Sequence, residues 1–212
     1  MNKTKIEYVN YTWNPLAGCK RGCSYCYARK IHQRFHPDIP FEQIVNYDER
    51  LEQPLKIKKP SRIFAGSMSD IEWWTPSQMK NVLDIVYQCP QHTFLFLTKN
   101  GETYGKYSFS KNCWLGVTIT GNEKYKFINR NINKMFLSIE PLLTEPQGLW
   151  LNSLISWVII GGLTPKPIHK KEWIDNILKE ADRLKIPVFI KDNAHYPKIR
   201  KEFPILNEEK IN

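Results

Sequence analysis

Short, nearly continuous apolar runs recur along the chain and are separated by polar segments long enough for helices. Runs without strict polar alternation are typical of parallel strands that are buried on both faces. We therefore expect strands at residues 12–15, 61–66, 93–98, 114–119, 135–140, 157–162 and 187–191. Seven such strands predict a partial barrel.

Helix signals lie between several of these runs. One helix should begin at Thr75, a favoured N-cap residue, with Pro76 at the first helical position. Its buried face is expected to hold Met79, Val82, Leu83 and Val86. A second helix is expected over 170–184, with Trp173, Ile177, Leu178 and Ala181 buried, and the first crossover helix within 28–55. Together these elements predict one α/β domain over 1–212 with outer helices and a frayed tail at 207–212.

Composition sets limits on the setting and on the partners. The chain has 212 residues and a formal charge of +10, an excess that favours phosphate-rich partners or reflects compositional bias. It contains no run of about 18 apolar residues, so we expect no membrane span. The five cysteines are an odd number and no signal peptide is recognisable, which favours a reducing, cytoplasmic setting over a disulfide framework.

Three of the cysteines stand close together, in the order Cys19-x3-Cys23-x2-Cys26. Three thiolates can hold three irons of a cubane iron–sulfur cluster and leave the fourth iron open for a small ligand. Structural zinc is the alternative, because His32 or His36 could complete a Cys₃His site.

The spacing of Cys19, Cys23 and Cys26, with an aromatic residue before the last cysteine, resembles the radical S-adenosylmethionine (SAM) enzymes. This resemblance implies a partial TIM-like (β/α)6–7 barrel, in which the cysteine loop follows the first strand. The three cysteines would bind a [4Fe–4S] cluster, and the open iron would bind SAM, with Tyr25 near the adenine. An external one-electron donor would drive cleavage of SAM to methionine and a 5′-deoxyadenosyl radical.

Active sites of (β/α) barrels lie at the carboxyl ends of the strands, so polar residues at those ends are candidate cofactor contacts. The candidates are Ser67, Ser69, Asp70, Thr118, Ser138, Glu140, Gly161 and Gly162. Some of them have structural alternatives: Ser69 and Asp70 as a helix N-cap or an Asx turn, Glu140 paired with a lysine such as Lys99 or Lys191, and the two glycines as a tight turn. Cys89 and Cys113 are expected to be buried at the amino ends of strands, and Trp73 and Trp74 to pack or to cover a ligand.

Four further stretches resemble a phage- and prokaryote-associated family of uncharacterised radical-SAM-like proteins. They are residues 12–15, residues 66–70, residues 114–117 with 138–143, and residues 157–162. That family often has a longer insertion between its first and second cysteine ligands. The resemblance and the charge favour a radical SAM enzyme acting on an unknown substrate, such as a nucleic acid or nucleotide. The alternative is a non-catalytic zinc- or cluster-bearing nucleic-acid-binding module.

Overall fold

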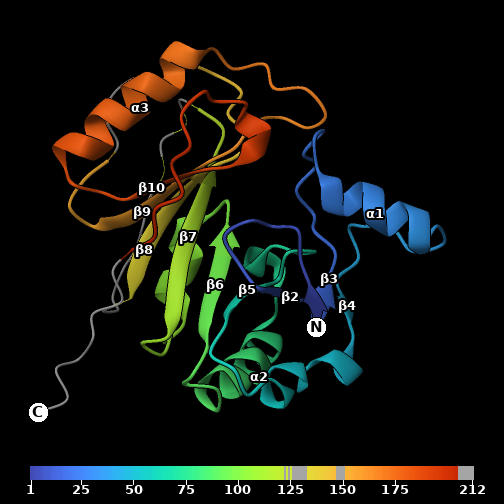
Figure 1. The fold of residues 1–212 in the computed structure, drawn as a ribbon. Coiled ribbons are helices and arrows are strands. Elements are labelled where there is room, and N and C mark those ends of the chain that lie inside the picture. Colours follow the sequence, from blue (N-terminus) through green and yellow to red (C-terminus); the bar gives the residue numbers. More distant parts are fainter. Residues whose placement is uncertain (122, 124, 126–132, 147–150, 205–212) are drawn as a thin grey trace, which may run out of the picture. The chain divides into compact units, whose positions relative to one another are not determined.

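The computed structural model describes residues 1–121, 123, 125, 133–146 and 151–204 (Figure 1). The expected frayed tail at 207–212 lies outside these residues. The chain forms two compact units, the first made of residues 1–118 and 125–134 and the second of residues 119–124 and 135–212. Each unit is described by itself below.

The first unit contains a mostly parallel sheet. Its strands are β1 (Asn2–Lys3), β2 (Tyr11–Trp13), β5 (Arg62–Ala65), β6 (Thr93–Thr98) and β7 (Cys113–Ile119), adjacent in that order. Strands β2, β5, β6 and β7 are parallel, and β1 is antiparallel to β2. A separate two-stranded sheet pairs β3 (Leu16–Ala17) with β4 (Val45–Asn46). Trp13 at the end of β2 is level with Ala65 at the end of β5, so the segments that follow both strands leave the same edge of the sheet.

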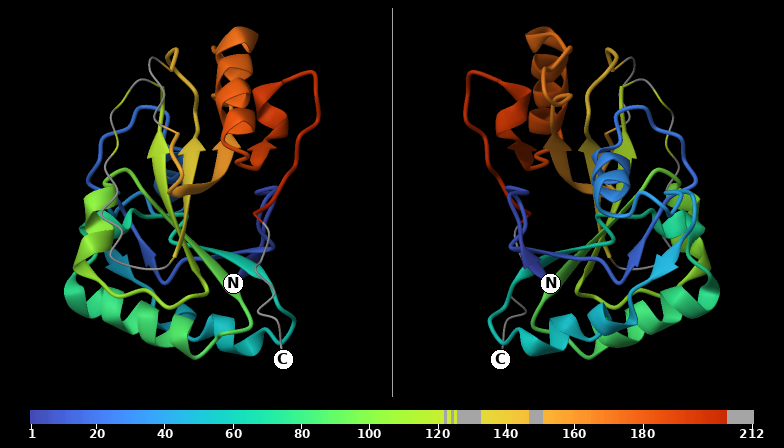
Figure 2. Two further views of the ribbon diagram at one scale, coloured as in Figure 1. Left: turned by 90° about the vertical axis from the view of Figure 1, so that its left-hand side faces the viewer. Right: turned by 90° about the vertical axis from the view of Figure 1, so that its right-hand side faces the viewer.

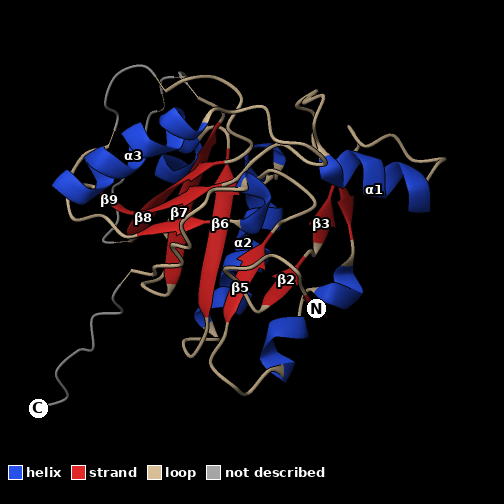
Figure 3. Cartoon of the chain, turned by 45° about the horizontal axis from the view of Figure 1, so that its top comes forward, coloured by secondary structure: helices blue, strands red, loops and turns tan. Residues whose placement is uncertain are grey.

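Helices α1 (Tyr27–Phe35) and α2 (Pro76–Tyr87) belong to the first unit, together with short 3-10 helices (Figure 3). The 3-10 helices are η1 (Asp48–Arg50), η2 (Gln53–Lys56), η3 (Ile71–Trp73) and η4 (Gly101–Lys106). Helix α2 begins as predicted, because Thr75 and Gln78 form a reciprocal capping box. Met79, Val82 and Val86 are buried as expected, but the fourth buried residue is Ile85 and Leu83 is half-exposed.

The second unit contains β8 (Lys134–Ile139), β9 (Ile155–Ile160) and β10 (Val188–Ile190), which are parallel, together with α3 (Lys171–Arg183) and η5 (Asp192–Ala194) (Figure 2). The predicted buried face of α3 was partly wrong. Trp173 and Leu178 are half-exposed, whereas Ile174 and Glu180 are buried beside Ile177 and Ala181. Arg183 donates two hydrogen bonds to the Glu180 carboxylate, at 2.8 and 2.5 Å. This pairing lets an acid occupy a face that the apolar pattern assigned elsewhere.

The strands carry the core. Trp13, Ile63, Phe94, Phe96 and Trp157 are all fully buried, and each lies in a strand. The mixed α/β class with mostly parallel strands is therefore confirmed. No helix among the described residues is long and apolar enough to cross a membrane.

The two remaining cysteines behave as predicted. Cys89 follows α2 and Cys113 opens β7, and both side chains are buried and free. Burial raises the pKa of Cys113 to about 12, so this thiol stays protonated at neutral pH.

Candidate functional site

The cysteine loop connects β3 to α1 and is anchored by backbone hydrogen bonds where it begins. Gly18 N donates to Met68 O at 3.0 Å, and Cys19 N donates to Phe41 O at 2.7 Å. Gly18 has a φ of 110°, and a Cβ at this position would lie 2.2 Å from Gln43 O. Only glycine fits this close approach, so residue 18 sets the direction in which the loop leaves the sheet.

All three loop thiols are free and partly exposed. Cys19 Sγ accepts a hydrogen bond from Arg21 N at 3.4 Å. Cys26 is the N-cap of α1, and its Sγ accepts from Arg29 N at 3.4 Å. A helix N-terminus stabilises a thiolate, which is the form that binds metal. Cys23 lies between Cys19 and Cys26 in the sequence, so the loop carries three free thiols in succession.

The loop's donor set fits a cubane cluster. Desolvation, together with the charges of Asp70, Cys26 and Cys23, raises the pKa of Cys19 to about 11. A cationic metal group would relieve this repulsion between neighbouring thiolates. Among the described residues, no three His, Cys, Asp or Glu side chains are grouped to hold a single metal ion. A cubane binds each cysteine through a separate iron, so its ligands do not meet at one point.

His32, one of the two histidines that could complete a zinc site, is already engaged. His32 is 1% exposed, and its Nε2 lies 2.8 Å from Ile39 O. Its ring also packs against the rings of His36 and Phe41, at centroid distances of 5.3 Å each. These contacts give His32 a structural role in the turn that follows α1.

The turn after β5 lies beside the start of the cysteine loop, where Gly18 and Ser69 form a parallel bridge. Ser67 Oγ donates to Asn14 Oδ1 at 3.1 Å, and Tyr27 OH donates to Ser67 O at 2.7 Å. The hydroxyl of Ser67, a predicted cofactor contact, therefore already has a partner within the chain. These bonds tie the turn both to the segment after β2 and to the first residue of α1.

Asp70 occupies the structural position that the sequence offered as an alternative. It is the N-cap of η3, 8% exposed, and Oδ1 accepts from Glu72 N at 3.0 Å. Oδ1 also accepts from Thr98 Oγ1 at 2.6 Å, and Oδ2 accepts from Lys99 N at 3.1 Å. The carboxylate thus joins the carboxyl ends of β5 and β6, and its predicted contact with a cofactor remains a prediction.

The two tryptophans after this turn differ. Trp74 is buried, and its Nε1 donates to Ser69 Oγ at 3.1 Å, so it packs as ordinary core. Trp73 is half-buried under the ammonium of Lys20, which lies 5.9 Å from the ring centroid. Thr118, another predicted contact, is half-buried near the end of β7.

Sequence reasoning missed a polar network beside the cysteine loop. Arg21 forms an ion pair with Glu72, and Asn100 Nδ2 donates to Glu72 Oε1 at 2.9 Å. Lys99 Nζ lies 5.3 Å from the ring centroid of Tyr25, the residue expected near an adenine. These residues come from the cysteine loop, from η3 and from the segment after β6, which lie far apart in the sequence. The only signal in the sequence was the basic character of the loop, which favours an acidic neighbour.

In the second unit, Glu140 forms an ion pair with Lys191, one of the two lysines that the sequence named. Gly161 packs against this acid, since a Cβ there would lie 2.8 Å from Glu140 Cδ. Ser138 is buried within β8, opposite Ile159 of β9. The ion pair with Lys191 and the contact with Gly161 give Glu140 a structural role, and a glycine at 161 is needed for this contact. The cofactor role predicted for these residues remains a prediction.

Gly162 has a comparable structural role. Its N donates to Asn193 Oδ1 at 3.3 Å, and Asn193 Nδ2 donates back to Gly162 O at 2.9 Å. A Cβ at Gly162 would lie 2.5 Å from Asn193 O. The close backbone approach that the glycine pair predicted is therefore made, in this structure, to the chain itself.

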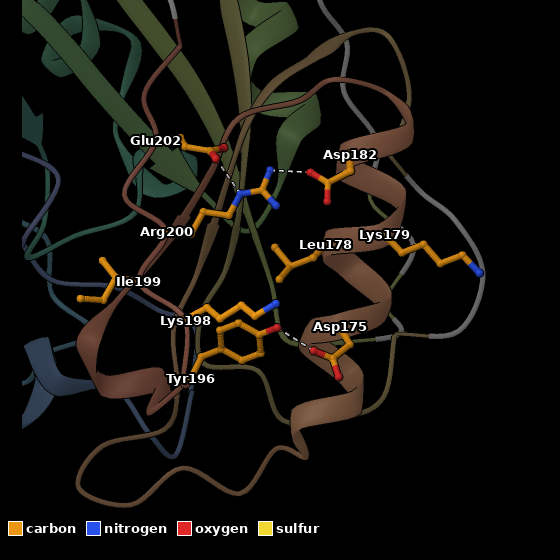
Figure 4. A pocket seen from close by; sticks show the side chains of 9 residues that line it. All are labelled: Asp175, Leu178, Lys179, Asp182, Tyr196, Lys198, Ile199, Arg200 and Glu202. Carbon is orange, nitrogen blue, oxygen red and sulfur yellow. Dashed lines mark hydrogen bonds and ion pairs between the residues drawn. The ribbon is translucent and has the colours of Figure 1, made fainter.

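A hollow of about 660 Å³ opens in the second unit between α3 and residues 196–202 (Figure 4). Tyr196 OH donates to Asp175 Oδ1 at 2.6 Å. Arg200 donates to Asp182 at 2.6 Å and to Glu202 at 2.8 Å. The hollow is lined by these paired charges, and none of the residues expected to bind a cofactor lines it.

A protein-family model described as "Protein of unknown function (DUF5131)" matches residues 3–207. No curated protein and no solved structure matches the chain.

Proposed function

This chain belongs to the DUF5131 family of proteins of unknown function, and we propose that it is a radical SAM enzyme. Cys19, Cys23 and Cys26 hold a [4Fe–4S] cluster, and SAM binds at the open iron. The observation that carries the proposal is the loop itself: three free thiols in succession, two of them accepting backbone N–H bonds.

The position of the loop supports this function. Residues 14–26 follow β2 and residues 66–70 follow β5, and these parallel strands are adjacent. Ligands of parallel α/β sheets bind beyond the carboxyl ends of the strands. The finer architecture we propose is the partial TIM-like (β/α)6–7 barrel of this enzyme class.

The bound cluster and SAM would supply a 5′-deoxyadenosyl radical. Side chains of the protein would hold the cluster and SAM in position. Cys26 Sγ accepts a hydrogen bond from the first turn of α1, and Asp70 holds the turns after β5 and β6 together. Tyr25, whose ring lies beneath Lys99 Nζ, would be placed beside the adenine, as in the enzyme class it resembles.

The proposed partners follow from composition. An external donor would deliver one electron, and five free cysteines suit a reducing cytoplasm. The charge of +10 favours a nucleic acid or a nucleotide as the substrate.

The test is anaerobic reconstitution with iron and sulfide, followed by optical and electron paramagnetic resonance (EPR) spectra, metal counts and a 5′-deoxyadenosine assay after reduction. Wild type should carry iron and sulfide in the ratio of one [4Fe–4S] cluster and should release 5′-deoxyadenosine from SAM. Cys23→Ala should lose both properties. Cys89→Ala, which removes a buried thiol outside the loop, should keep both. A colourless wild-type protein that holds zinc and leaves SAM intact would instead identify the non-catalytic binding module.

A further inference from the structure

Two arginines beside the cysteine loop each keep a buried N–H group without a hydrogen-bond acceptor. In the described part of the chain, Arg21 Nε and Arg29 Nη2 are shielded from solvent and have no partner. An unpaired buried donor is unfavourable, and one belonging to a charged group is more so. Two such donors around one loop indicate a missing acceptor.

Both guanidinium groups are held in place by other contacts. Arg21 forms an ion pair with Glu72, and Arg29 forms one with Glu42. The Arg29 guanidinium carbon also lies 5.2 Å from the ring centroid of Phe41. Each guanidinium group is therefore anchored by its ion pair, while Nε of Arg21 and Nη2 of Arg29 can still donate a hydrogen bond.

Beyond the carboxylates that pair with them, the loop sulfurs lie within electrostatic reach of both arginines. A charge on Cys19 acts on both guanidinium groups, and a charge on Cys26 acts on Arg29. The main-chain N–H groups of the same two residues already donate to the sulfurs of Cys19 and Cys26. Each arginine thus contacts a cysteine sulfur through its main-chain N–H and interacts electrostatically with the thiols through its side chain.

We propose that Arg21 Nε and Arg29 Nη2 donate hydrogen bonds to the sulfur atoms of the cluster held by the loop, and so raise its reduction potential. The inference rests on the function proposed above. Hydrogen bonds to cluster sulfurs stabilise the reduced form, which carries one more negative charge. Arg21 and Arg29 are therefore positioning and tuning residues rather than catalytic ones.

A purely structural role for these arginines predicts a different result. If they only hold the loop through Glu72 and Glu42, then removing either partner of an ion pair should have the same effect. If they act on the cluster, removing the arginine should change the potential, whereas removing the carboxylate should leave it nearly unchanged. Glu42→Gln and Glu72→Gln are therefore the matched controls.

The experiment is a potentiometric titration of the reconstituted protein with dithionite, in which one electron passes from dithionite to each oxidised cluster and the reduced cluster is counted by EPR. The set comprises wild type, Arg21→Gln, Arg29→Gln, the two glutamine controls and Arg34→Gln, which removes an exposed charge from the same helix as Arg29. Each of Arg21→Gln and Arg29→Gln should lower the ratio of reduced to oxidised cluster at a fixed potential about tenfold, equivalent to ~59 mV for one electron. The three controls should stay within about twofold of wild type.

Three outcomes overturn the inference. Unchanged potentials in loaded Arg21→Gln and Arg29→Gln would do so, as would equal shifts in the arginine and glutamate variants. A wild type that assembles no cluster would refute the proposed function, and the inference with it. If Arg21→Gln or Arg29→Gln does not assemble the cluster, Arg21→Lys or Arg29→Lys supplies the same readout. Lysine keeps the positive charge but lacks the planar set of donors of arginine, so a smaller decrease in the reduction potential is expected.

Discussion

The hydroxyl of Thr98 donates a buried hydrogen bond of 2.6 Å to Asp70 Oδ1, joining the last residue of β6 to the turn after β5. Asn100 N donates in turn to Thr98 Oγ1 at 3.0 Å. The side chain of Thr98 thus holds two neighbouring strand ends together at the edge where the cysteine loop lies.

Thr98→Val should lower the free energy of unfolding by about 1–3 kcal/mol, because a buried carboxylate and a backbone N–H each lose a partner. Urea denaturation with an unchanged m-value checks this. Thr103→Val is the matched control, since Thr103 is equally buried and its hydroxyl has no partner among the described residues. That substitution should be neutral or stabilising, and an equal loss in both variants would contradict the assigned role of Thr98.

Gly161→Ala should destabilise the protein by about 1–3 kcal/mol, because the new Cβ would overlap the Glu140 side chain and separate it from Lys191. Thermal and urea unfolding measure the loss. The loss should shrink in a Glu140→Ala background, which removes the overlapping atoms. Gly22→Ala, where an added Cβ meets no atom within 4 Å, should be close to neutral. A full loss that persists without the Glu140 side chain would show that the contact is not the cause.

Asp175 should contribute to the pH dependence of stability. Hydrogen bonds from Lys171 and then from Tyr196 lower the pKa of this carboxyl below its ordinary 3.8. A carboxyl whose pKa is depressed in the folded state stabilises the fold above the unfolded-state pKa, and this contribution is lost as the pH falls through the folded-state pKa. The difference in unfolding free energy between wild type and Asp175→Asn should therefore narrow as the pH falls below 3.8. A difference that stays constant across this range would exclude the linkage.

Tyr196 should contribute to the pH dependence of stability at alkaline pH. Desolvation, together with the hydrogen bond to Asp175, raises the pKa of Tyr196 to about 12. Its stabilising contribution is complete below the ordinary value of 10.0 and is lost as the pH rises towards 12. In a tyrosinate absorbance titration, Tyr196→Phe should remove a tyrosine that ionises late. Removal of one that ionises near 10.0 would be the contrary result.

The cysteines should fall into two reactivity classes. Under anaerobic, native conditions, iodoacetamide should modify Cys19, Cys23 and Cys26 of the metal-free protein, because these thiols are partly exposed. Cys19 should react slowly, because its pKa is raised to about 11. Cys89 and Cys113 are buried and should react only after denaturation. Peptide mass spectrometry locates the adducts. Reconstitution with iron and sulfide should protect the three loop cysteines, and alkylation of the reconstituted protein at the same rate would count against cluster binding.

Strand positions could be read from the sequence where the apolar run is continuous. The strand expected at 93–98 is the observed β6, because every residue between its two threonines is apolar. The first predicted strand was less accurate. It was expected at 12–15, whereas β2 ends at Trp13, ahead of Pro15, which has no N–H for a sheet.

The contacts of the candidate site could be predicted from the sequence only in part. The N-cap role of Asp70 and a lysine partner for Glu140 could be anticipated, because local motifs and charge pairing offer few choices. The Arg21–Glu72 ion pair joins residues 51 positions apart, and no pattern in the sequence connects them. The two compact units were not anticipated either, since strand spacing carries no information about which contacts are shared.

The cysteine loop begins at two backbone hydrogen bonds, Gly18 to Met68 and Cys19 to Phe41, and neither involves the residues between Cys19 and Cys23. The chain between these two cysteines can therefore be lengthened without breaking either anchor. This part of the loop is therefore a natural insertion point, where added residues would leave Cys19 in its place. An insertion there would have to leave Arg21 in place, because its main-chain N–H donates to Cys19 Sγ and its side chain pairs with Glu72.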